Sequence, residues 1–375
     1  MGESKKMFDE VLKLESSFFY SCLEKIGEGL FNAEKNFYED YISKEEFLQM
    51  LYDKSDKNLE FLARKSKLLT DRFFGKTILL YAPLYISNYC INKCLYCGFS
   101  ALNENVIRKK LSRQEIIYEM EVLRNKGFDS ILILTGDDRR NSPLEYIGET
   151  VKLARKYFSE VLVEIYALSV EEYKYLVDIG LTGVTIYQET YDELLYDKLH
   201  LSGPKKDFKF RLLSAERAII AGVKQVSIGP LLGLNKNFWY DVYMAAIHAS
   251  YLQSTYPEIE VSISFPRIQP SEANMKVEYS VDDKSFVRII CATRVFLPRV
   301  GINISTRELP YMRDNLIGLG ITKMSAGSKT TVGGYANVSE DTGQFEISDT
   351  REVDEIIKVL YQKGYRPEFT NWVKV

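Results

Sequence analysis

From about residue 77 onwards, short apolar runs alternate with amphipathic segments. The apolar runs predict strands at 77–86, 130–134, 161–166, 183–187, 224–229, 261–265, 301–305 and 321–325. The segments between them have helical periodicity, for example 112–126, 143–158, 170–179, 211–221 and 239–254. Eight strands alternating with helices over about 250 residues predict an α/β fold, a complete (β/α)8 TIM-type barrel. Active sites of such barrels lie at the C-terminal ends of the strands.

The barrel is expected to carry an extension at each end. Residues 1–75 are predicted to form an N-terminal helical extension, in which Ser43 caps a helix with Glu46 three residues further on. The barrel itself is expected to span 76–335. Residues 336–375 are expected to form a short C-terminal extension that packs on the barrel and is helical through 351–363.

The composition excludes several classes of protein. Hydrophobic residues make up 46% and charged residues 27% of the chain, which indicates a globular protein. The net charge of −3, with scattered basic residues, gives no reason to expect a nucleic-acid or membrane partner. No apolar run is long enough to predict a membrane span, and residues 1–6 lead into no signal-peptide core. We therefore expect a cytoplasmic protein.

Three of the five cysteines lie in one octet directly after the first predicted strand. Cys90, Cys94 and Cys97 are spaced as Cys-x3-Cys-x2-Cys, and thiolates select zinc or iron–sulfur centres. A 4Fe-4S cluster normally takes four thiolates, so three protein ligands would leave one iron open to a non-protein ligand. Cys22 and Cys291 are expected to be buried free thiols, which fits a reducing compartment.

Two alternative roles for the three clustered cysteines stay open. The spacing would also place the three thiols on one apolar face of a helix, although neighbours such as Asn92 and Gly98 make a poor core helix. A closed structural zinc site would need a fourth ligand. The candidates lie far away along the chain: Cys22, Cys291, His200 and His248.

The cysteine spacing, with the aromatic Tyr96 before the last cysteine, resembles the signature of the radical S-adenosylmethionine (SAM) enzymes. This resemblance implies a 4Fe-4S cluster on the three cysteines, with SAM on the open iron and Tyr96 beside its adenine. Gly136 and Asp137 resemble the segment that holds the methionine amino group of SAM, with Asp137 in place of the usual Glu. Gly229, at the end of the fifth strand, resembles the ridge that binds adenine.

Later segments resemble a narrower group, the aromatic amino-acid lyases within the radical SAM family. The segments are 186–191, 200–211 and the ends of strands six to eight. By this resemblance, Glu189 would lie near the SAM ribose and Arg211 would pair with the SAM carboxylate. Asp192 stands where relatives often have His, and we expect no catalytic role for it. Glu164, a carboxylate among apolar strand residues, is expected to face cofactor or substrate or to be paired structurally.

Three polar residues at strand ends are expected to position the substrate. By the same resemblance, Arg307 would bind an amino-acid carboxylate with Ser325 as hydrogen-bond partner, and Arg267 would make a second polar contact. The alternative for Arg307 is an ion pair with Glu308 or Asp314.

The resemblance implies a lyase that splits the Cα–Cβ bond of L-tyrosine. A radical made from SAM would take hydrogen from the tyrosine amino group, and the products would be 2-iminoacetate (dehydroglycine) and p-cresol. The expected partners are the thiazole synthase of thiamine biosynthesis and flavodoxin or ferredoxin as electron donor. A hydrogenase-maturation lyase is an alternative, argued against by the missing C-terminal cysteines. A tryptophan lyase and a non-enzymatic iron–sulfur or zinc-binding protein also stay open.

Overall fold

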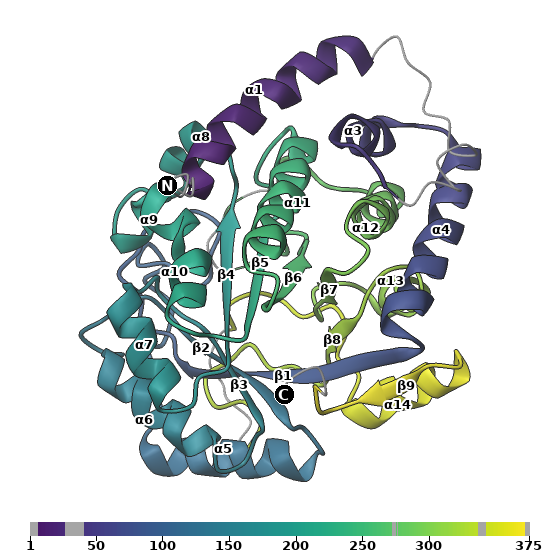
Figure 1. Cartoon of the computed structure of the whole chain (residues 1–375). Coiled ribbons are helices and arrows are strands. Elements are labelled where there is room, and N and C mark those ends of the chain that lie inside the picture. Colours follow the sequence, from purple (N-terminus) through teal and green to yellow (C-terminus); the bar gives the residue numbers. More distant parts are fainter. Residues whose placement is uncertain (1–6, 27–40, 272–274, 276, 337–342, 372–375) are drawn as a thin grey trace.

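Eight parallel strands close into a barrel that is surrounded by helices (Figure 1). The computed structural model describes residues 7–26, 41–271, 275, 277–336 and 343–371, so residues 1–6 lie outside it. The strands are β1 Thr77–Ser87, β2 Ser130–Thr135, β3 Glu160–Glu164, β4 Gly183–Glu189, β5 Gln225–Pro230, β6 Glu260–Ser264, β7 Gly301–Ile304 and β8 Lys323–Ser325. They pair in sequence order, and β1 pairs with both β8 and β2, which closes the ring. The predicted (β/α)8 barrel is confirmed.

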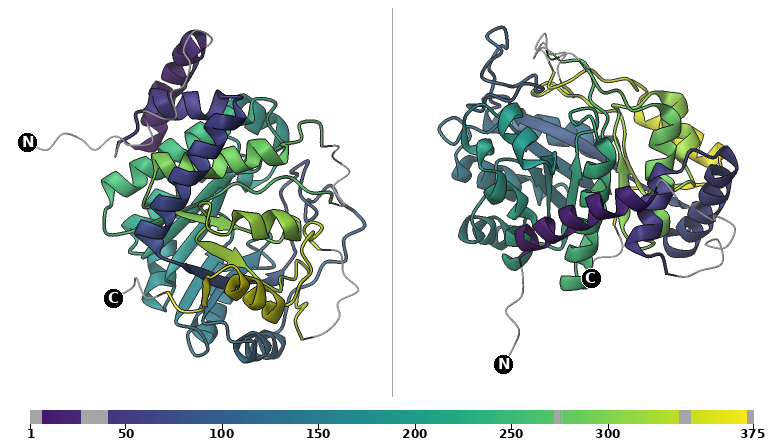
Figure 2. Two further views of the ribbon diagram at one scale, coloured as in Figure 1. Left: turned by 90° about the vertical axis from the view of Figure 1, so that its right-hand side faces the viewer. Right: turned by 90° about the horizontal axis from the view of Figure 1, so that it is seen from above.

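Helices connect the strands on the outside of the barrel (Figure 2). They are α5 Arg113–Asn125, α6 Leu144–Ala154, α7 Val170–Asp178, α8 Glu193–Leu199, α9 Phe208–Leu212, α10 Ser214–Ile220, α11 Phe238–Thr255, α12 Asp283–Phe296 and α13 Pro310–Leu316, with a 3₁₀ turn η1 at Pro204–Lys206. Crossover helices cover the outer face of a parallel sheet, so the strands are apolar and buried on both faces. No helix in the described part of the chain has both the length and the apolar content to cross a bilayer.

Three N-terminal helices form an outer layer over one side of the barrel. These helices, α1 Phe8–Ile26, α3 Lys44–Tyr52 and α4 Asp56–Phe74, pack on α11 and α12 (Figure 1). The predicted cap of α3 is confirmed, because the Ser43 hydroxyl accepts from the Glu46 amide and the Glu46 carboxylate accepts from the Ser43 amide. Phe8 of α1 stacks on His248 of α11 with 3.9 Å between ring centroids, so this histidine is part of the core.

The C-terminal part of the chain returns to the barrel. Helix α14 Val353–Gln362 matches the predicted helix, whereas strand β9 Arg366–Glu368, which pairs with the start of β1, was not predicted. Before α14, residues 343–351 run along the C-terminal ends of the strands. The amides of Ser348 and Asp349 there donate to the carbonyl of Thr306 at 2.9 and 3.1 Å.

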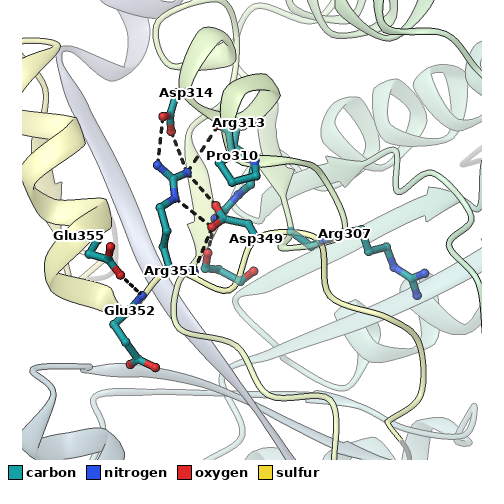
Figure 3. Close-up of polar contacts among 10 residues, drawn as sticks. Arg307, Pro310, Arg313, Asp314, Asp349, Arg351, Glu352 and Glu355 are labelled. Carbon is teal, nitrogen blue, oxygen red and sulfur yellow. Dashed lines mark hydrogen bonds and ion pairs between the residues drawn. The ribbon is translucent and has the colours of Figure 1, made fainter.

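A buried ion-pair network fixes this C-terminal segment (Figure 3). Arg313 of α13 is 0% exposed, and its guanidinium contacts the Asp349 carboxylate and the carbonyl of Ser325 at the end of β8. Arg351 donates to Asp349 at 2.9 and 2.7 Å and to Asp314 at 3.0 and 2.9 Å. The network therefore joins α13, β8 and the C-terminal extension.

Candidate active site

A cavity lies at the C-terminal ends of the barrel strands, where active sites of this fold are expected. It brings together eight of the predicted site residues: Tyr96, Cys97, Asp137, Glu164, Glu189, Arg211, Arg307 and Ser325. The other predicted residues do not line it: Cys90, Cys94, Gly136, Gly229 and Arg267. Of these, the two cysteines belong to the loop after β1, and Gly136 packs against that loop.

The cysteine loop after β1 is held by the end of α8 and the segment that follows it. The amide of Lys93 donates to the carbonyl of Ser202 at 3.0 Å, and the amide of Leu95 donates to Leu199 at 3.1 Å. Cys94 and His200 face each other in this antiparallel bridge. The loop therefore has a defined conformation, although it contains no regular helix or strand.

The three thiols of the loop are close enough to influence one another. Burial, and then the charges of neighbouring thiolates, raise the pKa of Cys94, and burial raises the pKa of Cys90 to about 12. Burial also raises the pKa of Cys97. The ammonium of Lys205 lowers the pKa of Cys94 and Cys97 but does not offset the effect of burial, and coordination to a metal centre deprotonates a thiol outright. Cys22 and Cys291 are buried free thiols, as expected.

The donor set fits an iron–sulfur cluster better than a single ion. Among the residues that the structure describes, no three His, Cys, Asp or Glu side chains are arranged to share one metal ion. A cluster presents a separate iron to each thiolate and so accepts more widely spaced ligands. His200, a candidate fourth zinc ligand, has both ring nitrogens engaged, by the Tyr96 hydroxyl at 2.8 Å and the Tyr196 carbonyl at 2.7 Å.

Gly136 and Asp137, at the end of β2, support the cysteine loop. A Cβ on Gly136 would lie 2.4 Å from the carbonyl oxygen of Tyr89 and 3.0 Å from Cβ of Cys90, so a larger residue cannot fit. The Asp137 carboxylate accepts a hydrogen bond from the side-chain amide of Asn92 at 2.7 Å. The predicted contact of this segment with SAM stays a prediction.

Glu189 lies at the end of β4 in an unusual conformation. Its φ of 70° is the one positive value among non-glycine residues in the described ranges. Such strain persists where surrounding contacts impose it and is common at functional sites. Lys205 binds its carboxylate at 2.6 Å, and Arg211 lies 3.8 Å away while donating to the Tyr187 carbonyl. Burial would raise the pKa of Glu189, but these two cations outweigh it and hold the pKa below its usual value.

Lys205 was missed by the sequence reasoning. It lies in the 3₁₀ turn after α8, its amide donates to the Asn92 side chain at 3.0 Å, and its ammonium lies 5.5 Å from the centroid of the Tyr96 ring. The sequence feature that could have identified Lys205 is its position in segment 200–211, which resembles the aromatic amino-acid lyases.

Two oppositely charged side chains in the cavity have no charged partner. Arg307 forms no ion pair with any described residue, and its guanidinium carbon lies 3.3 Å from the centroid of the Phe345 ring. Figure 3 shows it pointing away from the network around Asp349. Glu164 makes no hydrogen bond or ion pair with the described residues. Burial, and then the charge of Glu189, raise its pKa to about 7.

The alternative of an ion pair for Arg307 is wrong, because both candidate carboxylates are bound elsewhere. Arg267 donates to both carboxylate oxygens of Glu308 at 3.0 Å, and Arg351 binds Asp314. Arg267 also binds Asp283 at 2.8 Å and does not line the cavity. These ion pairs hold Arg267 beside the cavity, and its expected contact with substrate stays a prediction.

Ser325 and Gly229 occupy different environments. The buried Ser325 hydroxyl lines the cavity, where it interacts with the Tyr81 hydroxyl and can also reach a ligand. Gly229 lies within β5, and a Cβ there would be 1.9 Å from the carbonyl oxygen of Ser264 in β6. Strand packing alone therefore requires this glycine, and its predicted contact with adenine stays a prediction.

Comparison with known proteins places these features in a family. Residues 84–244 match the model of the radical SAM superfamily, and residues 264–366 match the biotin and thiamin synthesis associated domain. The chain is 36% identical over 332 residues to 2-iminoacetate synthase of Salmonella typhimurium, covering 88% of each chain. It is 36% identical over 341 residues to the same enzyme of Escherichia coli, covering 91% of this chain and 90% of that one.

Solved structures show the same architecture. A crystal structure of HydG, a maturase of the [FeFe]-hydrogenase, matches with a TM-score of 0.88 and 33% identity, covering 95% of this chain and 80% of that one. HydG from Carboxydothermus hydrogenoformans matches with a TM-score of 0.90 and 30% identity, covering 98% and 86%. Membership in the radical SAM family implies SAM and a 4Fe-4S cluster. The chain belongs to the radical SAM family, in the group that contains the 2-iminoacetate synthases.

Proposed function

We propose that this protein is a radical SAM lyase that cleaves the Cα–Cβ bond of L-tyrosine to 2-iminoacetate and p-cresol. The relatives named 2-iminoacetate synthase support this reaction. One observation on the chain itself carries the substrate class. The cavity contains an unpaired guanidinium, Arg307, and an unpaired carboxyl group, Glu164, which complement the two charges of an α-amino acid.

Cys90, Cys94 and Cys97 would hold the 4Fe-4S cluster. When bound, the cluster and SAM supply a 5′-deoxyadenosyl radical that removes a hydrogen atom from the substrate. The residues of the chain position the groups and exclude water. Glu189, held by Lys205, is proposed to contact the SAM ribose.

Further contacts to SAM follow from the family resemblance. Arg211 is proposed to pair with the SAM carboxylate and Asp137 to accept from the methionine amino group. Tyr96 and Gly229 are proposed to lie against the adenine, with Gly136 giving the backbone close access.

Arg307 is proposed to bind the carboxylate of tyrosine. A guanidinium meets a carboxylate with two parallel hydrogen bonds, which fixes orientation as well as position. The Phe345 ring keeps the guanidinium in place without neutralising its charge. The buried hydroxyl of Ser325 supplies a further donor.

Glu164 is proposed to accept hydrogen bonds from the ammonium group of tyrosine. An ammonium beside this carboxylate favours its ionised form and so opposes the effect of burial on its pKa. With both ends of the amino acid held, the nitrogen that loses hydrogen has a fixed place, and positioning of this kind is a large part of catalysis.

The reaction defines the partners that we propose. 2-Iminoacetate hydrolyses readily, so a thiazole synthase is proposed to consume it directly. A flavodoxin or ferredoxin is proposed to supply two electrons per turnover, one to cleave SAM and one that, with a proton, reduces the 4-hydroxybenzyl fragment to p-cresol. Both fit the reducing cytoplasm that a cluster of free cysteines favours.

An anaerobic assay tests the proposed reaction. The protein is reconstituted with iron and sulfide and incubated with SAM, dithionite and L-tyrosine, and products are measured by mass spectrometry. We expect p-cresol, glyoxylate from hydrolysed 2-iminoacetate, and 5′-deoxyadenosine. Cyanide would indicate the hydrogenase-maturation reaction instead. 5′-Deoxyadenosine without p-cresol would exclude tyrosine, and L-tryptophan would then be tried.

Shortened ligands test the two charged anchors separately. In the wild type, tyramine, which lacks the carboxylate, and 3-(4-hydroxyphenyl)propionate, which lacks the amino group, should each bind more weakly than L-tyrosine. Hydrogen bonds to charged groups contribute about 1.5–3 kcal/mol, or roughly 10- to 150-fold in affinity. In Arg307→Met, tyramine should bind as well as L-tyrosine, because the group that binds the carboxylate is gone. In Glu164→Gln, the propionate should likewise bind as well as L-tyrosine, because the group that binds the ammonium is changed. Calorimetry on the SAM-loaded protein measures both.

Arg299→Met is the matched control for this experiment, because it removes the same charge as Arg307→Met from an exposed side chain outside the cavity. This variant should bind both shortened ligands more weakly than L-tyrosine, as the wild type does. A Glu164→Gln variant that still discriminates against the propionate as the wild type does would rule out the proposed contact with the ammonium.

A further inference from the structure

The C-terminal segment reaches the cysteine loop from the far end of the chain. The amide of Gly98, next to Cys97, donates to the carbonyl of Gln344 at 3.2 Å, and the Gln344 amide donates to Thr330 at 3.1 Å. A Cβ on Gly98 would lie 2.5 Å from the Gln344 carbonyl oxygen, so glycine is required for this approach. The backbone of residue 344 is thus fixed beside a cluster ligand.

The Gln344 side chain points at that ligand. Its Nε2 lies 3.8 Å from the Sγ atom of Cys97, within the range of an N–H···S hydrogen bond. Its Oε1 accepts from the Tyr85 hydroxyl at 2.8 Å. Burial raises the pKa of Tyr85 well above its usual value, so this hydroxyl stays protonated and able to donate. The opposite amide orientation would turn a carbonyl oxygen toward the sulfur, which is unfavourable when that sulfur is an iron-bound thiolate.

We propose that Gln344 is a positioning residue for the cluster, whose amide donates a hydrogen bond to the Cys97 sulfur and makes the cluster easier to reduce. The reduced cluster carries one more negative charge than the oxidised cluster, and part of that charge lies on the ligand sulfurs. A donor at the sulfur therefore stabilises the reduced form more, which raises the reduction potential. The electron comes from a low-potential one-electron donor of the flavodoxin or ferredoxin class.

Tyr85 has a supporting role in this arrangement. Its hydroxyl occupies the amide oxygen and so turns the amino group of Gln344 toward the sulfur. The inference rests on the binding of the cluster by the three cysteines. It does not depend on which amino acid is the substrate, because the potential is a property of the protein without substrate.

A redox titration of the reconstituted protein, without SAM or substrate and monitored by electron paramagnetic resonance, tests the proposal. Gln344→Leu keeps the approximate size of the side chain and removes the donor, so its midpoint potential should be lower than that of the wild type. Its Fe–S(Cys) stretching bands in resonance Raman spectra should move to higher frequency. Tyr85→Phe keeps the Gln344 amide but removes the hydrogen bond that orients it. Its midpoint potential should therefore fall by less than that of Gln344→Leu.

The control is Gln114→Leu, which changes an exposed glutamine of α5 in the same way and should leave the potential unchanged. Iron content and melting temperature are measured for each variant. A potential of Gln344→Leu equal to or above that of the wild type, at equal cluster content, would overturn the proposal. If Gln344→Leu holds no cluster, an unchanged potential in Tyr85→Phe would overturn it. Absence of p-cresol in the tyrosine assay would leave the result of this titration unaffected.

Discussion

A Cys94→Ala variant is expected to form no 5′-deoxyadenosine above background and to lack the absorbance and paramagnetic signals of a 4Fe-4S cluster. Cys94 is the middle cysteine of the loop in the sequence, and its side chain is buried. Three protein thiolates are the least that can hold the cluster with one iron left for SAM, so each is needed. Cys90→Ala and Cys97→Ala should give the same result. The measurements are iron and sulfide content, spectra, and 5′-deoxyadenosine by mass spectrometry.

The other two cysteines supply matched controls. Cys22 on α1 and Cys291 on α12 are free and buried in the hydrophobic core. Cys22→Ala and Cys291→Ala should keep cluster content and 5′-deoxyadenosine formation, with at most a modest loss of stability. A Cys94→Ala variant with a wild-type cluster signal would contradict the assignment of the ligands.

An Asp349→Ala variant is expected to lose about 3–5 kcal/mol of unfolding free energy, because removal of one partner leaves a buried charge uncompensated. The uncompensated group would be Arg313, which is 0% exposed. The same change loosens the cavity, since Arg313 also binds the carbonyl of Ser325 and the segment at Asp349 binds Thr306, next to Arg307. Urea unfolding of the wild type and the variant measures the difference.

Asp178→Ala is the control for this effect. Asp178 and Lys174 form an exposed ion pair on α7, with both side chains 56% exposed, and such pairs contribute about 0–1 kcal/mol. An Asp349→Ala loss no larger than that of Asp178→Ala would show that the network of Figure 3 is not important for stability.

The contribution of Asp349 should also depend on pH. Burial would raise the pKa of this carboxyl group, but the hydrogen bonds from Arg351 and the charge of Arg313 outweigh burial and hold the pKa below its ordinary value of 3.8. A carboxyl group with a lower pKa in the folded state contributes its full stability above the unfolded pKa. That contribution is lost as the pH falls through the folded value. The difference between wild type and Asp349→Ala should therefore shrink below about pH 4.

The barrel could be predicted because each strand is encoded locally. Buried parallel strands are continuous apolar runs, and the predicted bounds of β1 and β2 agree with the structure within one residue. Strand β4 extends two residues beyond its prediction, through Gln188 and Glu189, because pairing with Pro230 extends it past the apolar run. Strand β9 has the sequence Arg-Pro-Glu, which contains no strand signal, and its pairing with β1 is imposed by the tertiary fold.

The site was predictable where its chemistry lies in a short stretch of sequence. The three cysteines could be predicted from their spacing. Several other candidates could be predicted because they lie at the end of a predicted strand. Arg307 was predicted to bind substrate, but the sequence could not exclude an ion pair with Glu308 or Asp314, because their binding by Arg267 and Arg351 depends on the tertiary fold. Gln344 could not be predicted either, since it lies 247 positions from Cys97 and in a segment with no periodic pattern.

That separation has a consequence for biosynthesis. The cysteine loop leaves the ribosome long before residues 343–351, and before β8, whose pairing with β1 closes the barrel. An iron–sulfur cluster inserted into the growing chain would lack the groups that cover it and would face dissolved oxygen directly. We therefore expect the cellular iron–sulfur carrier to deliver the cluster after translation, to a chain that has already folded. Maturation would then be limited by the release of full-length protein and not by the appearance of the cysteines.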